Sequence, residues 1–224
     1  MNLCVLIPAY NEARAIGDLI DRLRGLLSPS DTCVVIDDCS TDETAEIVRK
    51  RGVRLLGHAQ RRGKGSALRT GLAFFLEHDY EACVLMDGDG QHDPLDVPRF
   101  KQKAAAEDLD VVIGDRMQRP EGMPVLRRLT NRFLSLLISL RAGVQIPDSQ
   151  CGFRLLKRKV VEKLDFSSSK FEIESEMILR AARAGFRIGT VPIRSIYGWE
   201  ESKIRPLRDG IRFFRFYFKD LLSR

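Results

Sequence analysis

The chain has 224 residues, and its 44% hydrophobic and 30% charged content is that of an ordinary soluble globular protein. No apolar run approaches the roughly 20 residues that span a bilayer, and the polar turn after the first apolar run is unlike a signal peptide. The five cysteines form no Cys-x-x-Cys pair, which indicates buried thiols in a reducing cytosol and excludes a disulfide framework or a zinc site.

Strands and helices alternate through the first half of the sequence. Apolar runs predict buried strands at 3–7, 32–36, 53–56, 82–86 and 111–113. Apolar spacing and turn residues predict helices at about 16–27, 41–51, 64–77 and 93–106. Ser40 and Glu43 form a capping box that is expected to open the second of these helices. This alternation is typical of βαβ units and a mostly parallel sheet.

Three of the strands run directly into acidic residues, at Asp37-Asp38, Asp87 and Asp115. Carboxyl ends of parallel strands share one edge, and ligands bind at that edge in open α/β sheets. The segment Asp87-Gly88-Asp89-Gly90-Gln91 offers closely spaced oxygen ligands of the kind that suit Mg²⁺ or Mn²⁺. Taken alone, this segment is as well explained by a polar turn after a strand.

Two common nucleotide-binding signatures are missing from this half. No Gly-x-Gly-x-x-Gly follows the first strand, and the glycine-rich loop at 63–66 lacks the P-loop spacing. A dinucleotide-dependent enzyme and an ordinary ATPase are therefore not favoured.

The second half has a different character. A helix at 127–141 places one row of apolar residues on one face, and core packing is the slightly favoured interpretation of that face. The row consists of Leu129, Phe133, Leu136, Leu137 and Leu140. A polar segment at 148–154 leads into a short strand at 155–156, a helix follows at 172–184, and 187–193 forms a last strand that Pro192 marks as an edge.

The net charge of +6 is concentrated at the end of the chain, where residues 201–224 contain seven Lys or Arg and three Asp or Glu. A helix over 206–224 would carry a basic stripe formed by Arg208, Arg212, Arg215 and Lys219. Packing of Ile211, Phe214, Phe218 and Leu221 on the sheet would leave Phe213 and Tyr217 facing outward. Such a helix suits an anionic membrane interface. Nucleic acid is not expected, because no recognition motif accompanies the charge.

Nearly the whole chain resembles family 2 glycosyltransferases with the GT-A fold. More narrowly, it is similar to the branch of dolichol-phosphate mannose synthases and bacterial polyprenyl-phosphate sugar synthases. The matching segments, in chain order, are Ile7-Pro8-Ala9-Tyr10-Asn11-Glu12, Val35-Ile36-Asp37-Asp38-Cys39-Ser40-Thr41-Asp42, Gly63-Lys64-Gly65, Met86-Asp87-Gly88-Asp89-Gly90-Gln91, Gly114-Asp115-Arg116, Gln150-Cys151-Gly152-Phe153-Arg154, Val191-Pro192-Ile193 and Ser202-Lys203-Ile204.

The resemblance implies an inverting hexosyltransferase that uses a GDP- or UDP-linked sugar and Mg²⁺ or Mn²⁺. It implies a metal site at Asp87, Asp89 and Gln91, with Asp87 nearer the ribose. The nucleotide-sugar site would consist of Pro8, Tyr10, Glu12, Asp38, Lys64, Asp87, Gly88, Asp89, Gln91, Arg116 and Lys203. The catalytic residues would be Asp89, Arg116 and Asp148. We expect one domain over 1–224, with a donor half at 1–116, an acceptor half at 117–205 and the basic aromatic helix at 206–224.

The expected acceptor is a polyprenyl phosphate, which is already an anion and needs no strong base. A hydroxyl acceptor would need one, with Asp148, Glu174 or Glu176 as candidates. The enzyme would lie on the cytoplasmic face of the membrane, held by its amphipathic helices or by an anchoring partner protein. A non-catalytic membrane adaptor stays as an alternative. A sugar-nucleotide pyrophosphorylase is disfavoured, because Pro8-Ala9-Tyr10-Asn11 stands where its glycine-rich signature belongs.

Overall fold

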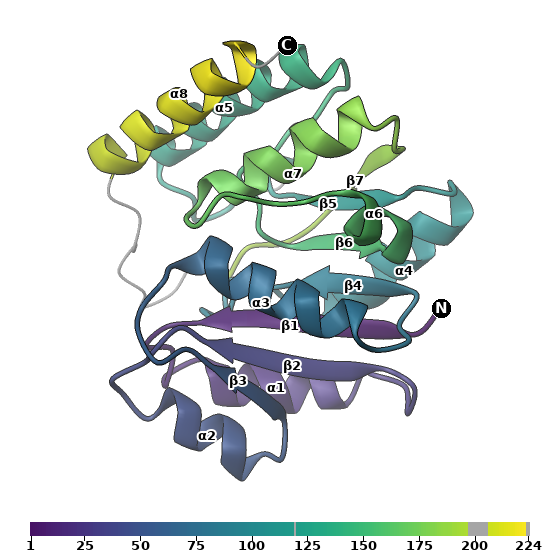
Figure 1. The fold of residues 1–224 in the computed structure, drawn as a ribbon, viewed down its shortest axis with the longest axis vertical. Coiled ribbons are helices and arrows are strands. Elements are labelled where there is room, and N and C mark those ends of the chain that lie inside the picture. The colour runs from purple at the N-terminus through teal and green to yellow at the C-terminus, as the bar shows by residue number, and fades with distance from the viewer. Residues whose placement is uncertain (119, 197–205, 223–224) are drawn as a thin grey trace.

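The computed structural model describes residues 1–118, 120–196 and 206–222 (Figure 1). Its strands are β1 (Leu3–Ala9), β2 (Thr32–Asp37), β3 (Arg54–Gly57), β4 (Ala82–Leu85), β5 (Val111–Asp115), β6 (Arg154–Lys157) and β7 (Ile188–Pro192). Its helices are α1 (Ile16–Arg24), α2 (Thr44–Lys50), α3 (Lys64–Leu76), the 3₁₀ turn η1 (Pro94–Asp96), α4 (Val97–Ala106), α5 (Val125–Ala142), α6 (Arg158–Lys163), α7 (Glu172–Arg183) and α8 (Pro206–Leu222).

The strands form one mostly parallel sheet in the order β3-β2-β1-β4-β6-β5-β7. Only β6, among these strands, runs against its neighbours, pairing antiparallel with both β4 and β5. Its first residue, Arg154, lies opposite Leu85 at the end of β4. The sheet edge that receives the carboxyl ends of β1, β2, β4 and β5 therefore also receives the segment that leads into β6.

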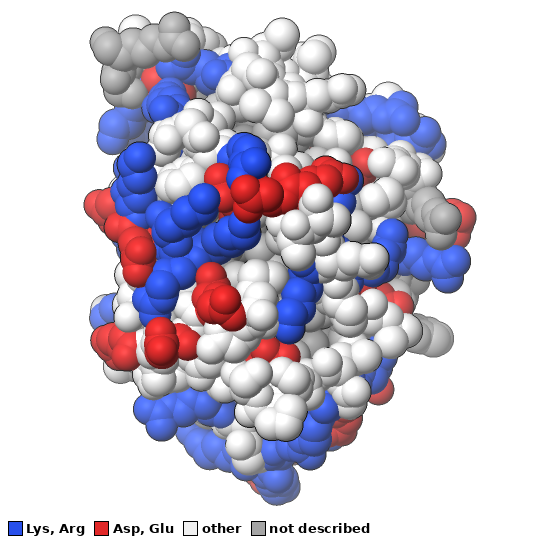
Figure 2. Space-filling view, turned by 90° about the vertical axis from the view of Figure 1, so that its right-hand side faces the viewer, with Lys and Arg blue, Asp and Glu red and all other residues white. Residues whose placement is uncertain are grey.

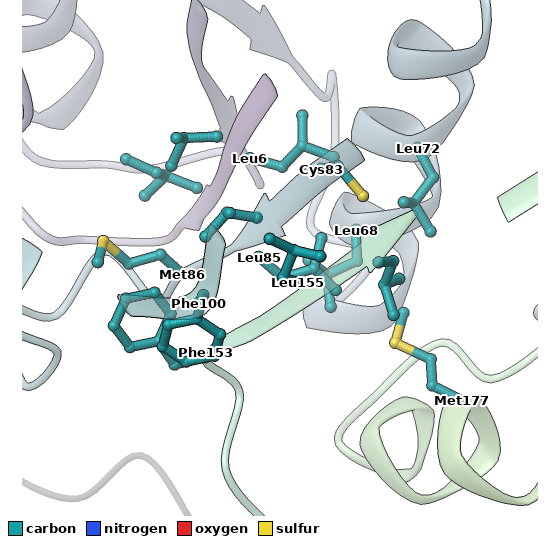
Figure 3. Close-up of a cluster of buried hydrophobic side chains, with 14 of the residues drawn as sticks. Leu6, Leu68, Leu72, Cys83, Leu85, Met86, Phe100, Phe153, Leu155 and Met177 are labelled. Atoms are coloured by element: carbon teal, nitrogen blue, oxygen red, sulfur yellow. The ribbon is translucent and has the colours of Figure 1, made fainter. Parts of the chain in front are cut away.

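Helices cover both faces of the sheet. In Figure 1, α3, α6 and α7 lie on the face toward the viewer, and α1 and α4 lie on the other face. The core between the layers is built from the apolar strands and from one side of each helix. Figure 3 shows part of it, where Leu68 and Leu72 of α3 and Met177 of α7 surround Leu155 of β6. The predicted α/β fold is confirmed.

All seven predicted strands are present, and β7 lies at an edge of the sheet as Pro192 indicated. The short helix α6 was not predicted. The predicted capping box is wrong, because α2 begins at Thr44 and no side chain caps it. The Ser40 hydroxyl instead donates to Asp37 at the end of β2. Ser40 thereby stabilises the turn after the strand and not the helix.

The predicted packing of α5 is wrong. Four of the five residues of its apolar row are exposed, with Leu140 71% and Phe133 53% exposed, and only Leu137 of the row packs against the core. The buried positions of this helix are Asn131, Ser135 and Ile138, and Ser135 exchanges hydrogen bonds with Ser149. A polar contact with the loop before β6 therefore decides which side of α5 faces the protein.

The predicted orientation of α8 is reversed. Phe213 is buried, whereas Phe218 is 55% and Ile211 62% exposed. Asp220 pairs with Arg141 of α5 at 3.2 Å and with Arg183 of α7. Because Phe213 and Tyr217 lie seven and three residues before Asp220, they share its inward face. The side chain of Arg208 lies outside the described part of the chain.

The surface carries charges of both signs. Figure 2 shows lysine and arginine interspersed with aspartate and glutamate over the face that it displays. Within the residues that the structure describes, none of the helices combines the length and apolar character needed to cross a bilayer. The division into donor and acceptor halves stays a prediction.

Candidate active site

The loops after β1 and β2 form one end of the carboxyl edge. Asn11 adopts a left-handed conformation with φ of 53°, and its backbone nitrogen donates to the Ser40 hydroxyl at 2.9 Å. The amide nitrogen of Glu12 donates to the Thr44 hydroxyl at 2.8 Å. These bonds fix the backbone of the segment that carries Tyr10 and Glu12. The guanidinium of Arg61 lies 3.8 Å from the centre of the Tyr10 ring.

Asp38 organises the loop that precedes α3. Its carboxylate contacts His58 at 2.8 Å and accepts hydrogen bonds from the backbone nitrogens of Arg62 at 2.8 Å and Gly63 at 2.6 Å. The other ring nitrogen of His58 contacts Thr70 at 2.9 Å. Asp38 thus places the start of α3, and its predicted contact with the nucleoside stays a prediction.

Lys64, at the start of α3, connects the two sides of the site. Its ammonium lies 2.5 Å from an oxygen of Asp87, after β4, and 2.7 Å from an oxygen of Glu174, in the first turn of α7. The other carboxylate oxygen of Glu174 is buried and has no hydrogen-bond partner. Burial opposes the charge of Lys64, but the two carboxylates outweigh it and raise the pKa of Lys64.

Close backbone approach is required around this ion cluster. A β-carbon on Gly152 would lie 2.7 Å from Asp87 and 2.8 Å from Lys64. A β-carbon on Gly65 would lie 2.5 Å from the carbonyl oxygen of Ser168, in the segment that leads to α7. Glycine at both positions lets the loop before β6 and the segment before α7 pack against the end of β4 and the start of α3.

The environment of Asp87 keeps it ionised. Burial would raise the pKa of this carboxyl, but the positive charge of Lys64 holds it down to about 2. The backbone nitrogen of Asp87 donates to Nδ1 of His92 at 3.2 Å. Burial lowers the pKa of His92 to about 4, so its ring is neutral and can accept this bond at neutral pH. The ring of His92 stacks on Phe153, with 5.0 Å between centroids.

The donor set of the predicted metal site suits a hard divalent cation. Asp89 and Gln91 are half-buried, and the backbone nitrogen of Gln91 donates to the Asp89 carboxylate at 3.0 Å, which closes the turn. Among the described residues, no group of three acidic, histidine or cysteine side chains is arranged to hold a metal by itself. Protein sites commonly hold Mg²⁺ or Mn²⁺ with one or two carboxylates together with substrate phosphates, and the carboxylate of Asp89 beside the side-chain oxygen of Gln91 is a donor set of that kind.

Arg116 is held by Asp148 in a buried bidentate pair. The Nε and Nη2 atoms of Arg116 lie 2.6 and 2.9 Å from the two oxygens of Asp148, whose side chain is fully buried. Both oxygens are therefore occupied, and neither is presented to a substrate. We interpret Asp148 as the residue that positions Arg116, and this pairing does not favour it among the three base candidates for a hydroxyl acceptor.

The remaining base candidates differ in their surroundings. Glu176 accepts hydrogen bonds from the backbone of Ser167 and Ser168 and pairs with Arg180 at 2.8 Å, so it holds the segment before α7. Glu174, by contrast, belongs to the Lys64 cluster. Asp115, expected at the same edge, is fully buried and caps its own turn through Met117 at 2.8 Å.

The structure brings most of the predicted site residues to one edge. Gly88 packs against Pro8, since a β-carbon there would lie 3.2 Å from the Pro8 carbonyl oxygen. Lys203 lies outside the described residues. Site residues that were not predicted are His58, His92 and Gly152. Gly152 stood in a recognised motif, whereas nothing in the sequence marked the two histidines as members of the site.

The open α/β sheet, with a diphosphate-compatible acidic turn after β4 and fixed cations beside it, defines a glycosyltransferase domain of the GT-A type. Residues 4–165 match the family model for glycosyl transferase family 2, and the chain belongs to that family.

Relatives with named activities support this assignment. The undecaprenyl-phosphate mannosyltransferase of Micrococcus luteus is 31% identical over 86% of this chain and 83% of its own length. The UDP-N-acetylglucosamine–dolichyl-phosphate N-acetylglucosaminyltransferase of Methanococcus voltae is 29% identical over 95% of this chain and 92% of its own length. The crystal structure of glucosyl-3-phosphoglycerate synthase from Mycobacterium tuberculosis, with Mn²⁺, UDP and phosphoglyceric acid, matches with a TM-score of 0.75 and 26% identity, over 99% of this chain and 78% of that one.

Proposed function

We propose that the protein transfers a hexose, with inversion, from a GDP- or UDP-linked sugar to a polyprenyl phosphate in a metal-dependent reaction. The observation that carries this proposal is the meeting of Asp87, Asp89 and Gln91 with Lys64 and Arg116 at one sheet edge. The names of the two polyprenyl-phosphate sugar transferases among the relatives support the acceptor class.

The chain's own residues account for the chemistry of such a transfer. A phosphate oxygen of the acceptor forms a bond to the anomeric carbon, and the bond to the nucleoside diphosphate breaks with its electron pair. Asp89 and Gln91 would hold a divalent cation, which would neutralise charge on that leaving group. Arg116, fixed by Asp148, supplies a preorganised cation. The acceptor phosphate is already an anion, so the occupied carboxylate of Asp148 is no obstacle.

The donor and metal part of the proposal is tested with the Asp89→Asn variant. Purified protein is incubated with labelled GDP- and UDP-hexoses, Mn²⁺ or Mg²⁺, and polyprenyl phosphate, and label is measured in the organic phase. We expect the substitution to lower the transfer rate by about a hundredfold or more, because it removes a charged metal ligand. Asp79→Asn is the matched control, because Asp79 is exposed and precedes β4 at the opposite edge of the sheet. Equal transfer rates in Asp89→Asn and wild type would contradict the site.

A hydroxyl acceptor is the second candidate, and one observation favours it. The glucosyl-3-phosphoglycerate synthase matches 99% of this chain, and its structure contains phosphoglyceric acid. Glu174, with one unpartnered oxygen, would then be the base in preference to Asp148. The same assay distinguishes the two candidates when phosphoglyceric acid is added, because a glycosylated phosphoglycerate stays in the aqueous phase, where chromatography separates it from the unreacted donor. Formation of that labelled product, with no label in the organic phase, would overturn the polyprenyl phosphate proposal.

A polyprenyl phosphate acceptor requires the enzyme to work at a membrane surface. We therefore propose a peripheral location on the cytoplasmic face, where nucleotide sugars are available. An anchoring partner protein stays a prediction. Fractionation of cells that express the protein, with and without a high-salt wash of the membranes, tests the peripheral location.

A further inference from the structure

Two neighbouring helices hold most of the exposed large apolar side chains. Of the sixteen such side chains in the described part of the chain, eleven lie on α5 and α8. Those on α5 are Val125, Leu126, Leu129, Phe133, Leu136 and Leu140. Those on α8 are Ile211, Phe214, Phe218, Leu221 and Leu222. A concentration of this kind on a soluble domain marks an interaction surface. These eleven residues are called the apolar ridge below.

The ridge is fixed to the fold and is not a loosely attached tail. Asp220 of α8 contacts Arg141 of α5 and Arg183 of α7, and these ion pairs hold the two helices at the same end of the molecule (Figure 1). Phe213 and its neighbour Tyr217, stacked at 6.0 Å between centroids, face the core. The exposed side chains of α8 are therefore those that remain after its packing on the protein is complete.

The positive charge around the apolar ridge indicates that its binding partner is anionic. The α5 sequence contains four arginines and no acidic residue. Arg132 on α5 and Arg215 and Lys219 on α8 are exposed beside the apolar side chains. Asp220, in contrast, is turned inward by its two arginine partners. Apolar side chains mixed with exposed cations and aromatic rings match the interface of an anionic bilayer, where phosphates meet acyl chains.

We infer that the apolar ridge of α5 and α8 docks the enzyme on an anionic phospholipid bilayer. Ser135 of α5 bonds to Ser149, the residue after the Asp148 that holds Arg116, so this docking holds the site close to the membrane. The inference takes from the proposed function only that the acceptor is a lipid. The ridge itself follows from exposure and charge.

The test uses the full chain and two kinds of vesicle, one of phosphatidylcholine alone and one with an equal part of phosphatidylglycerol. We expect cosedimentation with the anionic vesicles, weakened by added salt. The double variant Phe133→Ser with Phe218→Ser should bind the anionic vesicles at least about tenfold more weakly than wild type, because two aromatic anchors are lost. A triple variant, Arg132→Gln with Arg215→Gln and Lys219→Gln, should lose the preference for phosphatidylglycerol.

The matched control is Leu76→Ser with Leu95→Ser. These two exposed leucines lie on α3 and η1, outside the ridge, and their replacement should leave vesicle binding unchanged. Thermal unfolding verifies that each variant is folded. Equal vesicle binding by wild type and the double aromatic variant would overturn the inference. So would a wild-type dimer that this variant dissociates without any vesicle binding, because a second copy would then cover the ridge.

Transfer to a short, water-soluble prenyl phosphate separates this inference from the proposed function. If the ridge docks the enzyme, the double aromatic variant transfers sugar to this acceptor at the wild-type rate but loses transfer to acceptors embedded in vesicles. Absence of transfer in the wild-type protein, with vesicle binding intact, would refute the proposed function alone.

Discussion

Lys64 is the residue on which the two sides of the site depend most directly. It shares its ammonium between Asp87 and Glu174, and it is the positive charge nearest to both. Without it, two carboxylates would face each other in a mostly buried location, next to a glycine that leaves no room for rearrangement.

We expect Lys64→Met to lower the free energy of unfolding by about 3 kcal/mol or more, because it leaves buried charge without a partner. Glu174→Gln should cost less, about 1–2 kcal/mol, because Lys64 keeps Asp87 as its partner. Urea unfolding followed by circular dichroism measures both values. A smaller loss in Lys64→Met than in Glu174→Gln would show that the cluster does not work as described.

His92 gives the stability of the protein a defined acid dependence. Its pKa is lowered to about 4 by burial, whereas an unfolded histidine titrates near 6.5. The unfolded chain therefore binds a proton that the folded ring does not, and stability falls as the pH drops through this range. At pH 5 the loss from this residue amounts to about 2 kcal/mol relative to pH 7.

His92→Asn is the informative variant, because its amide oxygen can still accept the hydrogen bond from Asp87. Unfolding free energies at pH 7 and pH 5 should differ by about 2 kcal/mol less in this variant than in wild type. His78→Asn, which replaces an exposed histidine, should show the wild-type difference. An unchanged difference in His92→Asn would mean that the ring is not neutral in the folded state.

Among the elements, α8 depends on one acidic residue for its attachment. Asp220→Ala removes the carboxylate that pairs with Arg141 and Arg183 and leaves the mostly buried Arg141 guanidinium with the backbone carbonyl of residue 220 but without a charged partner. We expect hydrogen exchange across 206–222 to become at least about tenfold faster, with the strands unchanged. Lys219→Ala, one residue away and exposed, should leave the exchange at its wild-type rate. Equal exchange in both variants would mean that apolar packing alone holds α8.

The amphipathic helices show how far an apolar pattern can predict packing. Their positions and lengths followed from residue spacing, because that spacing is a local property of the chain. Which side faces the protein did not follow, because α5 is oriented by Ser135 contacting Ser149 and α8 by Asp220 contacting two arginines. Those partners are distant in sequence, and an apolar row predicts an inward face only when no polar contact competes with it.

For the whole molecule, the parallel sheet and the carboxyl-edge location of the site could be predicted, because alternating βαβ units fix both. The antiparallel direction of β6 could not, since a four-residue strand does not encode its direction. The contacts of Asp38 and Asp148 were equally hidden. The sequence does not show that Asp38, after β2, binds the backbone of Gly63, or that Asp148, in the loop before β6, holds Arg116.

Binding of a donor nucleotide should stabilise the entire domain, because the proposed nucleotide site draws on segments from residue 8 to residue 116. With UDP or GDP at a hundred times its dissociation constant and Mn²⁺ present, we expect a gain of about 2.7 kcal/mol. For a domain of this size, that corresponds to a rise in Tm of roughly 5–10 °C. Differential scanning calorimetry measures this shift, which Asp89→Asn should abolish. A shift that persists in Asp89→Asn would place the nucleotide elsewhere.

The insertion of β6 between β4 and β5 has a consequence for how the protein folds. The pairs among β1, β2 and β3 join neighbouring βαβ segments, but the pairs of β4 with β1, β6 with β4 and β7 with β5 each form across about seventy to eighty residues of chain. Contacts of such long range form late. Because Gly152 and Arg154 reach the carboxyl edge only when β6 is in place, competence to bind the nucleotide should arise in the last kinetic phase of refolding, after most secondary structure has formed.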